Sequence, residues 1–323
     1  MQSVEYQTIL TYLTLYYKGV SYRKAVRDFS DAKNKIAILE NAKKINTNFP
    51  DEAQRAFTYL KSHELHMGNI LYLGHSEYPK ELYRLQQPPL LLFLRGNRNL
   101  LTRKKVSLVG SRKPCLLSVA LTRQIARHFS ETGYVTVSGL AAGIDGVVHA
   151  NSLEGGTIGV LGSGFDYVYP VEHEYFYRMA KGQSKNILII SEHPDDRIPK
   201  PYLFLKRNRI IAALGESLFF MNGGKKSGAI STVQEMQKLG KNIFYLNHKL
   251  QKNNEGIAQI RLLGIESKDA TDDFPVTIKT KLSKDDLKQK PGYLGNSRWV
   301  IINRKSFSQL PFSPAQADLY FPE

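Results

Sequence analysis

From about residue 104 to residue 265, the sequence repeats one pattern: a short apolar run, a turn rich in Gly or Ser, and a stretch with helical spacing. The apolar runs predict strands at Val106–Val109, Tyr134–Val137, Thr157–Leu161, Ile187–Ile190, Leu218–Met221 and Ile243–Leu246. The other stretches predict helices over 115–131, 144–153, 172–181, 208–214, 228–239 and 256–263. Strands and helices that alternate in this way form parallel βαβ units with right-handed crossovers. We therefore predict an α/β fold with a doubly wound, mostly parallel sheet.

Three further segments flank the predicted core at 104–265. Residues 1–66 carry apolar side chains at helical spacing and predict a small helical (SAM-like) domain. Residues 67–103 hold two short apolar runs near turn-forming prolines, and we interpret them as a connecting segment that joins the core. Residues 266–323 show no repeat and predict an irregular C-terminal extension, with one strand expected over 297–302.

The charge of the chain favours a polyanionic partner. The formal net charge is +16, and residues 101–265 hold 22 Lys and Arg against 12 Asp and Glu. Such a field attracts nucleic acid or an anionic membrane surface, although a lysine-rich composition can also arise without a ligand. A membrane-surface protein would need a basic amphipathic helix, whereas the cations here gather at turns.

Other features of the sequence indicate the cellular compartment of the protein. The single cysteine, Cys115, cannot form an intramolecular disulfide, and we interpret it as structural. The first ten residues lack the order of a signal peptide, and the apolar runs are far shorter than the roughly 18 residues of a membrane span. We therefore expect a cytoplasmic protein that does not bind membranes.

Two turns after predicted strands have the composition of a phosphate site. In a doubly wound sheet, ligands bind at the carboxyl ends of the strands, where helix N-termini offer free N–H groups. The first turn is Gly110-Ser111-Arg112-Lys113, in which glycine permits close approach and arginine can grip a phosphate. The second contains Gly139 and Gly143, with Asp145 and His149 following. For Asp145 and His149 we favour a structural role in capping or holding the turn.

Two more basic clusters follow later strands. Lys206, Arg207 and Arg209 lie beside Tyr202 and Phe204, a combination that suits phosphate neutralisation and base stacking on single strands. Because this cluster opens the predicted helix at 208–214, where the helix dipole disfavours cations, an anionic ligand is a natural reason for it. Lys225 and Lys226 stand in a Gly-rich turn after the strand at 218–221.

The sequence lacks the residues that several other kinds of binding or catalytic site require. The Gly-rich turn at 159–170 has Tyr167 where a dinucleotide site needs its third glycine, and the turn at 223–228 lacks the order of a P-loop. The eight histidines do not form a metal-ligand pattern. We therefore predict no cofactor, no metal and no catalytic group.

Taken in order, the turns resemble the DprA/Smf family. Members of that family carry a Gly-Ser-Arg turn, a Ser-Gly-Leu-Ala-x-Gly-Ile-Asp segment with a following His, and Arg-Asn-Arg-Ile-Ile-Ala, which stand here at 110–112, 138–149 and 207–212. The resemblance covers roughly residues 70–265. Two pairs depart from it: Met221-Asn222 stands where Glu-Ala is usual, and Asn247-His248 where Pro-Gly is usual. The family's frequent winged helix is not recognisable in 266–323.

The resemblance implies an extended Rossmann-like domain that binds single-stranded DNA, forms a homodimer and assists loading of the recombinase RecA in natural transformation or recombination. It also implies DNA contacts at Arg112, Lys206, Arg207 and Arg209, to which charge and turn position add Lys113, Lys225 and Lys226. The alternative is a nucleotide-binding sensor or nucleotide-hydrolysing enzyme of the related Rossmann-like superfamily. The turn at 223–228 lacks the catalytic glutamate of such hydrolases, because Gln234 and Glu235 come too late.

Overall fold

The structure is a computed structural model of the 323-residue chain. It describes residues 4–19, 48, 50–62, 69–182, 184, 186–247, 254–271, 278–281 and 299–302. Residues 20–47 of the helical domain expected over 1–66, and most of the expected C-terminal extension, lie outside the described residues.

One nine-stranded sheet organises the molecule, in the order β1-β2-β6-β5-β4-β3-β7-β8-β9. All neighbouring strands from β6 to β9 are parallel, whereas β1 pairs antiparallel with β2, and β2 antiparallel with β6. This confirms the predicted α/β fold with a Rossmann-like, doubly wound, mostly parallel sheet. The strands are β1 Ile70–Tyr72, β2 Leu91–Gly96, β3 Lys105–Gly110, β4 Val135–Ser138, β5 Thr157–Val160, β6 Ile187–Ser191, β7 Ser217–Asn222, β8 Asn242–Tyr245 and β9 Lys268–Asp269.

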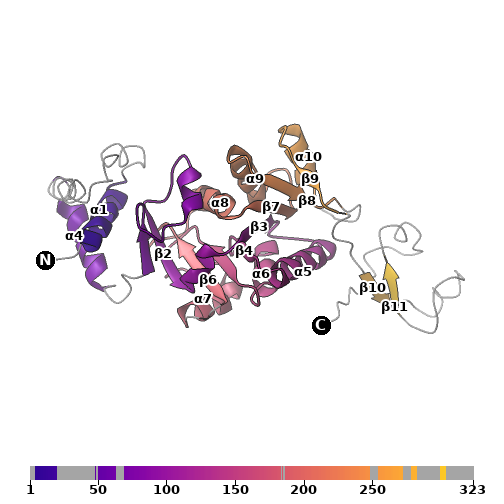
Figure 1. Ribbon diagram of the computed structural model, residues 1–323, viewed down its shortest axis with the longest axis horizontal. Coiled ribbons are helices and arrows are strands. Elements are labelled where there is room, and N and C mark those ends of the chain that lie inside the picture. The colour runs from indigo at the N-terminus through magenta and orange to yellow at the C-terminus, as the bar shows by residue number, and fades with distance from the viewer. Residues whose placement is uncertain are drawn as a thin grey trace, which may run out of the picture.

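Helices cover both faces of the sheet (Figure 1). The helices α8, α9 and α10 lie on one face, and α5, α6 and α7 lie on the other. Short 3-10 turns lie at Lys80–Arg84, Arg98–Thr102 and Val171–His173. The helices are α5 Leu116–Glu131, α6 Ile144–Ala150, α7 Glu174–Lys181, α8 Pro201–Leu214, α9 Gly228–Lys238 and α10 Gly256–Leu262.

The alternation of side chains along β3 divides the core into two layers. Val106 and Leu108 pack with α5 and α6, whereas Val109 packs in the cluster that includes α8 and α9. Each of these side chains is almost fully buried, and burying one such side chain stabilises the fold by about 1.5–3 kcal/mol. A strand buried on both faces is typical of the centre of a parallel sheet, where β3 lies between β4 and β7.

The N-terminal helices pack against the antiparallel edge of this sheet. The helices α1 (Val4–Lys18) and α4 (Pro50–Ser62) share one buried cluster with β1 and β2, to which Ile9, Leu60 and Phe93 contribute. Residues 67–103, expected as a connecting segment, therefore also supply the two antiparallel edge strands of the sheet. The domain boundary near residue 66 stays a prediction.

The structure corrects two predicted boundaries. The expected irregular extension at 266–323 begins with β9, which is the last strand of the sheet, and it holds an antiparallel pair, β10 (Ile278–Lys281) and β11 (Trp299–Ile302). The helix expected over 208–214 begins earlier, at Pro201, because proline is well suited to the first position of a helix. Lys206, Arg207 and Arg209 therefore lie inside α8 and do not open it, so the dipole argument does not apply to them. Among the described residues, no helix is long and apolar enough to cross a membrane.

Candidate nucleic-acid interface

The order in which strands are added to the sheet changes side at β3. From β3 the order runs through β4 and β5 to β6, and the chain then returns by α8 to place β7 on the other side of β3. Such a switch point is where doubly wound sheets bind ligands, outside the carboxyl ends of their strands. Gly110 at the end of β3 pairs with Asn222 at the end of β7, so the two turns that follow these strands are neighbours.

Hydrogen bonds fix the turn that follows β3. The Ser111 N–H donates to Asn222 Oδ1 at 3.3 Å, and the Lys113 N–H donates to Ser111 Oγ at 3.0 Å. The Ser111 carbonyl accepts from the Ile144 N–H at 3.0 Å, which ties this turn to the start of α6. A Cβ added to Gly110 would lie 2.6 Å from Ile144 Cγ1, so glycine is required there for packing inside the protein.

Arg112 projects from this turn toward an aromatic pair. It is exposed, and its Cζ lies 5.7 Å from the centroid of the Phe204 ring, which is within the range of a cation–π contact. The Tyr169 ring lies 5.7 Å from Phe204 and is 46% exposed. A guanidinium and two rings thus form a short row at the carboxyl edge of the sheet. Nothing in the sequence marks Tyr169 for this row, because Tyr169 follows β5 whereas Phe204 lies in α8.

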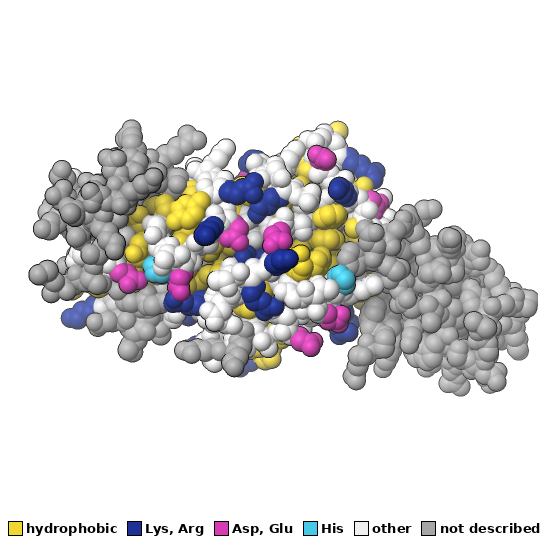
Figure 2. Space-filling view, viewed as in Figure 1, with side chains coloured by type: hydrophobic (Ala, Val, Ile, Leu, Met, Phe, Trp, Pro, Cys, Tyr) yellow, Lys and Arg dark blue, Asp and Glu magenta, His cyan; other side chains and the backbone are white. Residues whose placement is uncertain are grey.

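Exposed lysines lie in the same turn as Arg112 and in the turn next to it. Lys113 is exposed in the same turn as Arg112, and Lys225 and Lys226 are exposed in the adjacent turn after β7. Among the described residues, no carboxylate forms an ion pair with Arg112 or with these three lysines. On the face shown in Figure 2, Lys and Arg side chains gather across the middle of the molecule, with acidic side chains among them.

Arg207, which was expected to bind a phosphate, is buried and connects two strands to α8 by hydrogen bonds. Its side chain is 3% exposed, and Nη1 donates to the carbonyls of Gly139 (2.6 Å) and Val160. Nε donates to Asn208 Oδ1 at 3.2 Å. These contacts link the ends of β4 and β5 to α8. The expectation of a DNA contact at Arg207 is therefore corrected: its donors serve carbonyl groups that the fold buries.

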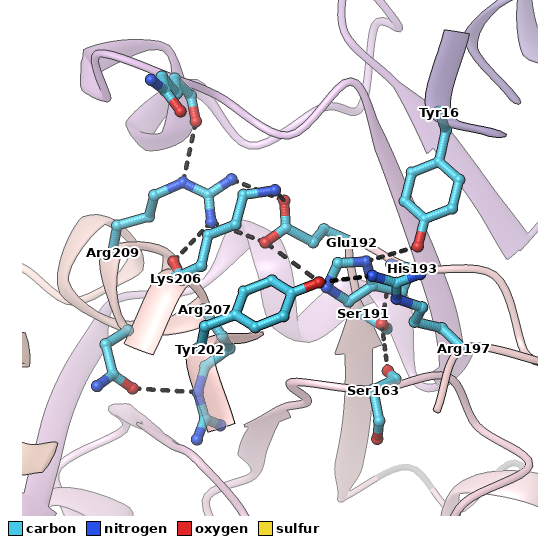
Figure 3. Close-up of polar contacts among 12 residues, drawn as sticks. Tyr16, Ser163, Ser191, Glu192, His193, Arg197, Tyr202, Lys206, Arg207 and Arg209 are labelled. Carbon is cyan, nitrogen blue, oxygen red and sulfur yellow. Dashed lines mark hydrogen bonds and ion pairs between the residues drawn. The ribbon is translucent and has the colours of Figure 1, made fainter. Parts of the chain in front are cut away.

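Arg209 is also directed inward. It is 9% exposed, and its guanidinium donates in a bidentate manner to Glu192 at 2.8 and 2.7 Å (Figure 3). Nε donates to the Gln87 carbonyl at 3.0 Å. Burial by itself would raise the pKa of Glu192, but Arg209 and Lys206 hold that pKa well below its usual range. Arg209 thus compensates a buried carboxylate, and the expected phosphate contact at Arg209 is corrected too.

Lys206 keeps the exposure that a DNA contact needs. Its side chain is 46% exposed, and its Nζ lies 3.3 Å from Glu192 Oε2. Because the bidentate pair with Arg209 already satisfies Glu192, the lysine is available to a phosphate at the surface. Of the basic residues at 206–209, Lys206 alone remains in the proposed interface.

Gly139 and Gly143 serve the protein's own packing. Gly139 is buried, and a Cβ there would lie 2.6 Å from the guanidinium of Arg207. Gly143 has a φ of +80°, and a Cβ there would lie 2.4 Å from the Ser111 carbonyl oxygen. The expected close approach of DNA at these glycines is corrected, because protein atoms already fill the space beside each of them.

Asp145 and His149 act inside the fold. Asp145 Oδ2 accepts from the N–H groups of Gly139 at 3.1 Å and Ala141 at 3.3 Å, so the carboxylate fastens the turn. It does not cap α6, whose N-cap is Gly143. His149 is fully buried, and its Nδ1 lies 2.7 Å from Thr157 Oγ1. Burial lowers the pKa of His149 to about 3, so the imidazole is neutral at neutral pH.

Comparison with known proteins identifies the family. A model of the family described as DNA recombination-mediator protein A matches residues 69–268, which contain strands β1 to β8 and the first residue of β9. The chain belongs to that family. This confirms the resemblance to DprA/Smf proteins. No group of side chains able to hold a metal ion occurs in the part of the chain that the structure describes.

Curated relatives and solved structures agree with the assignment. The chain is 35% identical over 179 residues to DNA processing protein DprA of Bacillus subtilis, covering 54% of this chain and 59% of that protein. It is 34% identical over 169 residues to DprA of Streptococcus pneumoniae, covering 52% of this chain and 58% of that protein. The matches thus span less than two thirds of these relatives.

Two DprA structures share the fold. DprA of Helicobacter pylori, whose structure is described as giving insights into a unique single-stranded DNA binding mode, matches with a TM-score of 0.55 and 30% identity. That match covers 62% of this chain and 90% of the other. DprA of Streptococcus pneumoniae matches with a TM-score of 0.62 at 23% identity, covering 84% of this chain and 96% of the other. The second likeness concerns the fold alone.

Proposed function

We propose that this chain binds single-stranded DNA along the carboxyl edge of its sheet. One observation supports this most strongly: the exposed Arg112 lies against the half-buried Phe204, in a turn that also exposes Lys113 and that neighbours the turn of Lys225 and Lys226. Cations neutralise phosphates, and aromatic rings accept stacked bases of any sequence, so such a surface suits single strands without sequence preference. The single-strand binding described for the Helicobacter pylori relative supports the same proposal.

The proposed contacts are fewer than the sequence suggested. We assign phosphate contacts to Arg112, Lys113, Lys206, Lys225 and Lys226, and the stacking surface to Phe204 and Tyr169. Duplex DNA keeps its bases stacked inside the helix and cannot use these rings, so we expect single strands to bind more tightly than duplexes. The protein in this proposal acts by binding and not by catalysis.

We extend the proposal to the cellular role implied by the family. The protein would hold single strands in the cytoplasm and present them to a RecA-type recombinase, during natural transformation or recombination, as a homodimer. The family description as a recombination mediator supports this role. Light scattering of the purified chain tests the dimer, and measurement of recombinase assembly on coated strands tests the mediator role.

The DNA site is tested by fluorescence anisotropy with a labelled oligonucleotide, as single strand and as duplex. We expect Arg112→Ala to weaken single-strand binding about tenfold or more, because a charge-assisted contact contributes about 1.5–3 kcal/mol. Lys206→Ala should weaken it less, because Lys206 also faces Glu192. The matched control is Arg127→Ala, since Arg127 is exposed on α5. Unchanged affinity in both Arg112→Ala and Lys206→Ala would refute the site.

A further inference from the structure

A cleft lies between the N-terminal helices and the start of α8. It has a volume of about 570 Å³, within the range of small-molecule sites of about 300–1,000 Å³. The helix α1 contributes Tyr16 and Tyr17 to its wall, and α4 contributes Arg55. The segment from β6 into α8 contributes most of the other polar groups, among them His193, Arg197, Lys200, Tyr202 and Lys206.

The cleft holds more positive charge than its carboxylates can balance. Glu192 is paired with Arg209 and Lys206, and Asp196 is paired with Arg55 at 3.1 Å. Arg197 and Lys200 form no ion pair with any carboxylate among the described residues. Lys200 also occupies the N-cap of the 14-residue helix α8, whose first turn has no acidic residue and no side-chain cap. A cation at a helix N-terminus is unfavourable unless an anion joins it.

Two buried nitrogen atoms in the wall of the cleft have no hydrogen-bond partner among the described residues. Arg197 donates through Nη2 to the Tyr202 hydroxyl at 2.8 Å, but its Nε is buried without a hydrogen-bond partner. His193 is 2% exposed, and its Nε2 likewise has no hydrogen-bond partner, with Glu192 Oε1 at 3.9 Å. Buried polar atoms are almost always satisfied in folded proteins, so these two atoms indicate a missing partner.

His193 Nε2 is a donor in one of the two neutral tautomers of the ring. His193 Nδ1 lies 3.0 Å from the Tyr16 hydroxyl (Figure 3). Burial raises the pKa of Tyr16, so its hydroxyl keeps its proton and can donate to Nδ1 or accept from it. Burial also lowers the pKa of His193 to about 4, so the ring is neutral, and its own proton lies on Nε2 when Tyr16 donates to Nδ1.

Aromatic rings lie beside these two nitrogen atoms. Figure 3 shows Tyr16, His193, Arg197 and Tyr202 close together, with Lys206 next to Tyr202. Tyr202 and Lys206 are four residues apart in α8 and so share one face of that helix. Tyr202 is 54% exposed, which leaves its ring open to stacking. The cleft thus joins anion-binding groups to rings that can pack against a base.

We propose that this cleft binds one nucleotide, with its phosphate on Arg197 and Lys200 at the N-terminus of α8 and its base against Tyr202 and Tyr16. The nucleotide is either free or the 5′-phosphorylated end of a DNA strand, because both present the same phosphate and base. In the second case the inference rests on the proposed function, whereas a free nucleotide binds independently of the Arg112 surface.

Two binding measurements on the full chain separate these sources. Calorimetric titration compares dAMP with deoxyadenosine, which lacks the phosphate. Fluorescence anisotropy compares a 5′-phosphorylated oligonucleotide with its 5′-hydroxyl form. We expect a preference for the phosphorylated ligand in at least one of the two measurements, and we expect Arg197→Gln to reduce that preference about tenfold or more.

Controls keep the outcome clear. Arg127→Gln changes an exposed cation on α5 and should leave both preferences unchanged. Tyr202→Leu removes a half-exposed ring, should weaken binding of the phosphorylated and the unphosphorylated ligand alike, and provides a second test if Arg197→Gln does not fold. The inference is overturned if wild type shows no phosphate preference in either measurement, if a folded Arg197→Gln retains that preference, or if Tyr202→Leu leaves the affinity for the preferred ligand unchanged. Binding of the 5′-hydroxyl strand that does not depend on Arg112 would refute the proposed function instead.

Discussion

Arg209 and Glu192 form a bidentate ion pair that is almost wholly buried. Removing one partner of such a pair leaves an uncompensated charge in the interior, which typically costs about 3–5 kcal/mol. We expect Arg209→Met to lower the free energy of unfolding by about 3 kcal/mol, since Lys206 at 3.3 Å still compensates part of the charge. Urea unfolding measures the change. Arg127→Met, on an exposed face, should stay within about 0.5 kcal/mol of wild type, and an equal loss in both variants would contradict this role.

Two buried histidines make the stability depend on pH. Burial lowers the pKa of His149 to about 3 and that of His193 to about 4, both below the unfolded value of about 6.5. Below pH 6.5 the unfolded chain binds protons that the folded chain does not, so the free energy of unfolding falls as the pH falls. Each histidine contributes a slope of up to about 1.4 kcal/mol per pH unit between pH 6.5 and its folded pKa.

The contribution of His149 can be isolated by substitution. His149→Asn keeps a polar group near Thr157 and removes the titrating ring, so we expect a smaller loss of stability between pH 7 and pH 5 than in wild type. Urea unfolding at pH 7, 6 and 5 measures that loss. The exposed His128→Asn serves as control and should keep the wild-type slope. The same slope in His149→Asn as in wild type would show that His149 is not buried in its neutral form.

At the scale of elements, the turn before α6 supports the turn that presents Arg112. Gly143 combines a positive φ with a close approach to the Ser111 carbonyl, whereas Gly240 has a φ of +64° and nothing within 4 Å of an added Cβ. Both glycines thus have a positive φ, and only Gly143 has a close contact. We expect Gly240→Ala to destabilise the fold by about 1–2 kcal/mol through strain. We expect Gly143→Ala to cost more, because its Cβ would also meet backbone atoms of the Ser111 turn.

Only Gly143→Ala should also displace the Ser111 turn, and so weaken binding of single-stranded DNA. Anisotropy titrations of both variants, at a temperature where both are folded, measure this difference. Equal affinities of the two variants would mean that the turn before α6 does not position Arg112.

The elements that could be predicted are those with a local signal. Each strand from β3 to β8 is a short apolar run bounded by a turn, and the predicted bounds differ from the observed ones by one residue or less. The start of α8 was missed because the polar and basic run at 206–209 interrupts its apolar residues. Helical spacing places Arg207 on the same face as the buried Ile211 and Leu214, so the length of α8 decides which of its cations face inward.

The Arg112 surface and the cleft beside α8 also differ in how far a local sequence pattern encodes them. The Arg112 turn is contiguous in sequence and was predicted, although its contact with Phe204 was not. The cleft beside α8 depends on Tyr16 meeting His193, which lies 177 residues later, and no local pattern encodes such a contact. The burial of Arg207 and Arg209 could not be foreseen either, because in the sequence both are basic residues like the exposed Lys206. In the fold, the Arg207 guanidinium donates to buried carbonyl groups, and the Arg209 guanidinium pairs with a buried carboxylate.

Across the whole molecule, the formal charge of +16 overstates what a strand of DNA would meet. Part of that charge lies in buried arginines or in ion pairs, and Lys113, Lys225 and Lys226 at the switch point are among the cations left exposed without a carboxylate partner among the described residues. The long-range field still steers a polyanion toward the protein, whereas the exposed cations at the carboxyl edge determine where it binds.

The salt dependence of single-strand binding tests this arrangement most directly. Each phosphate neutralised on a single strand contributes about −0.7 to the slope of log K against log salt. We predict that Arg112→Ala makes the slope shallower by about 0.7 and that Lys225→Ala with Lys226→Ala makes it shallower by up to about 1.4. Arg209→Met should leave the slope unchanged. A slope that responds to Arg209 but not to Arg112 would contradict the placement of DNA at the carboxyl edge of the sheet.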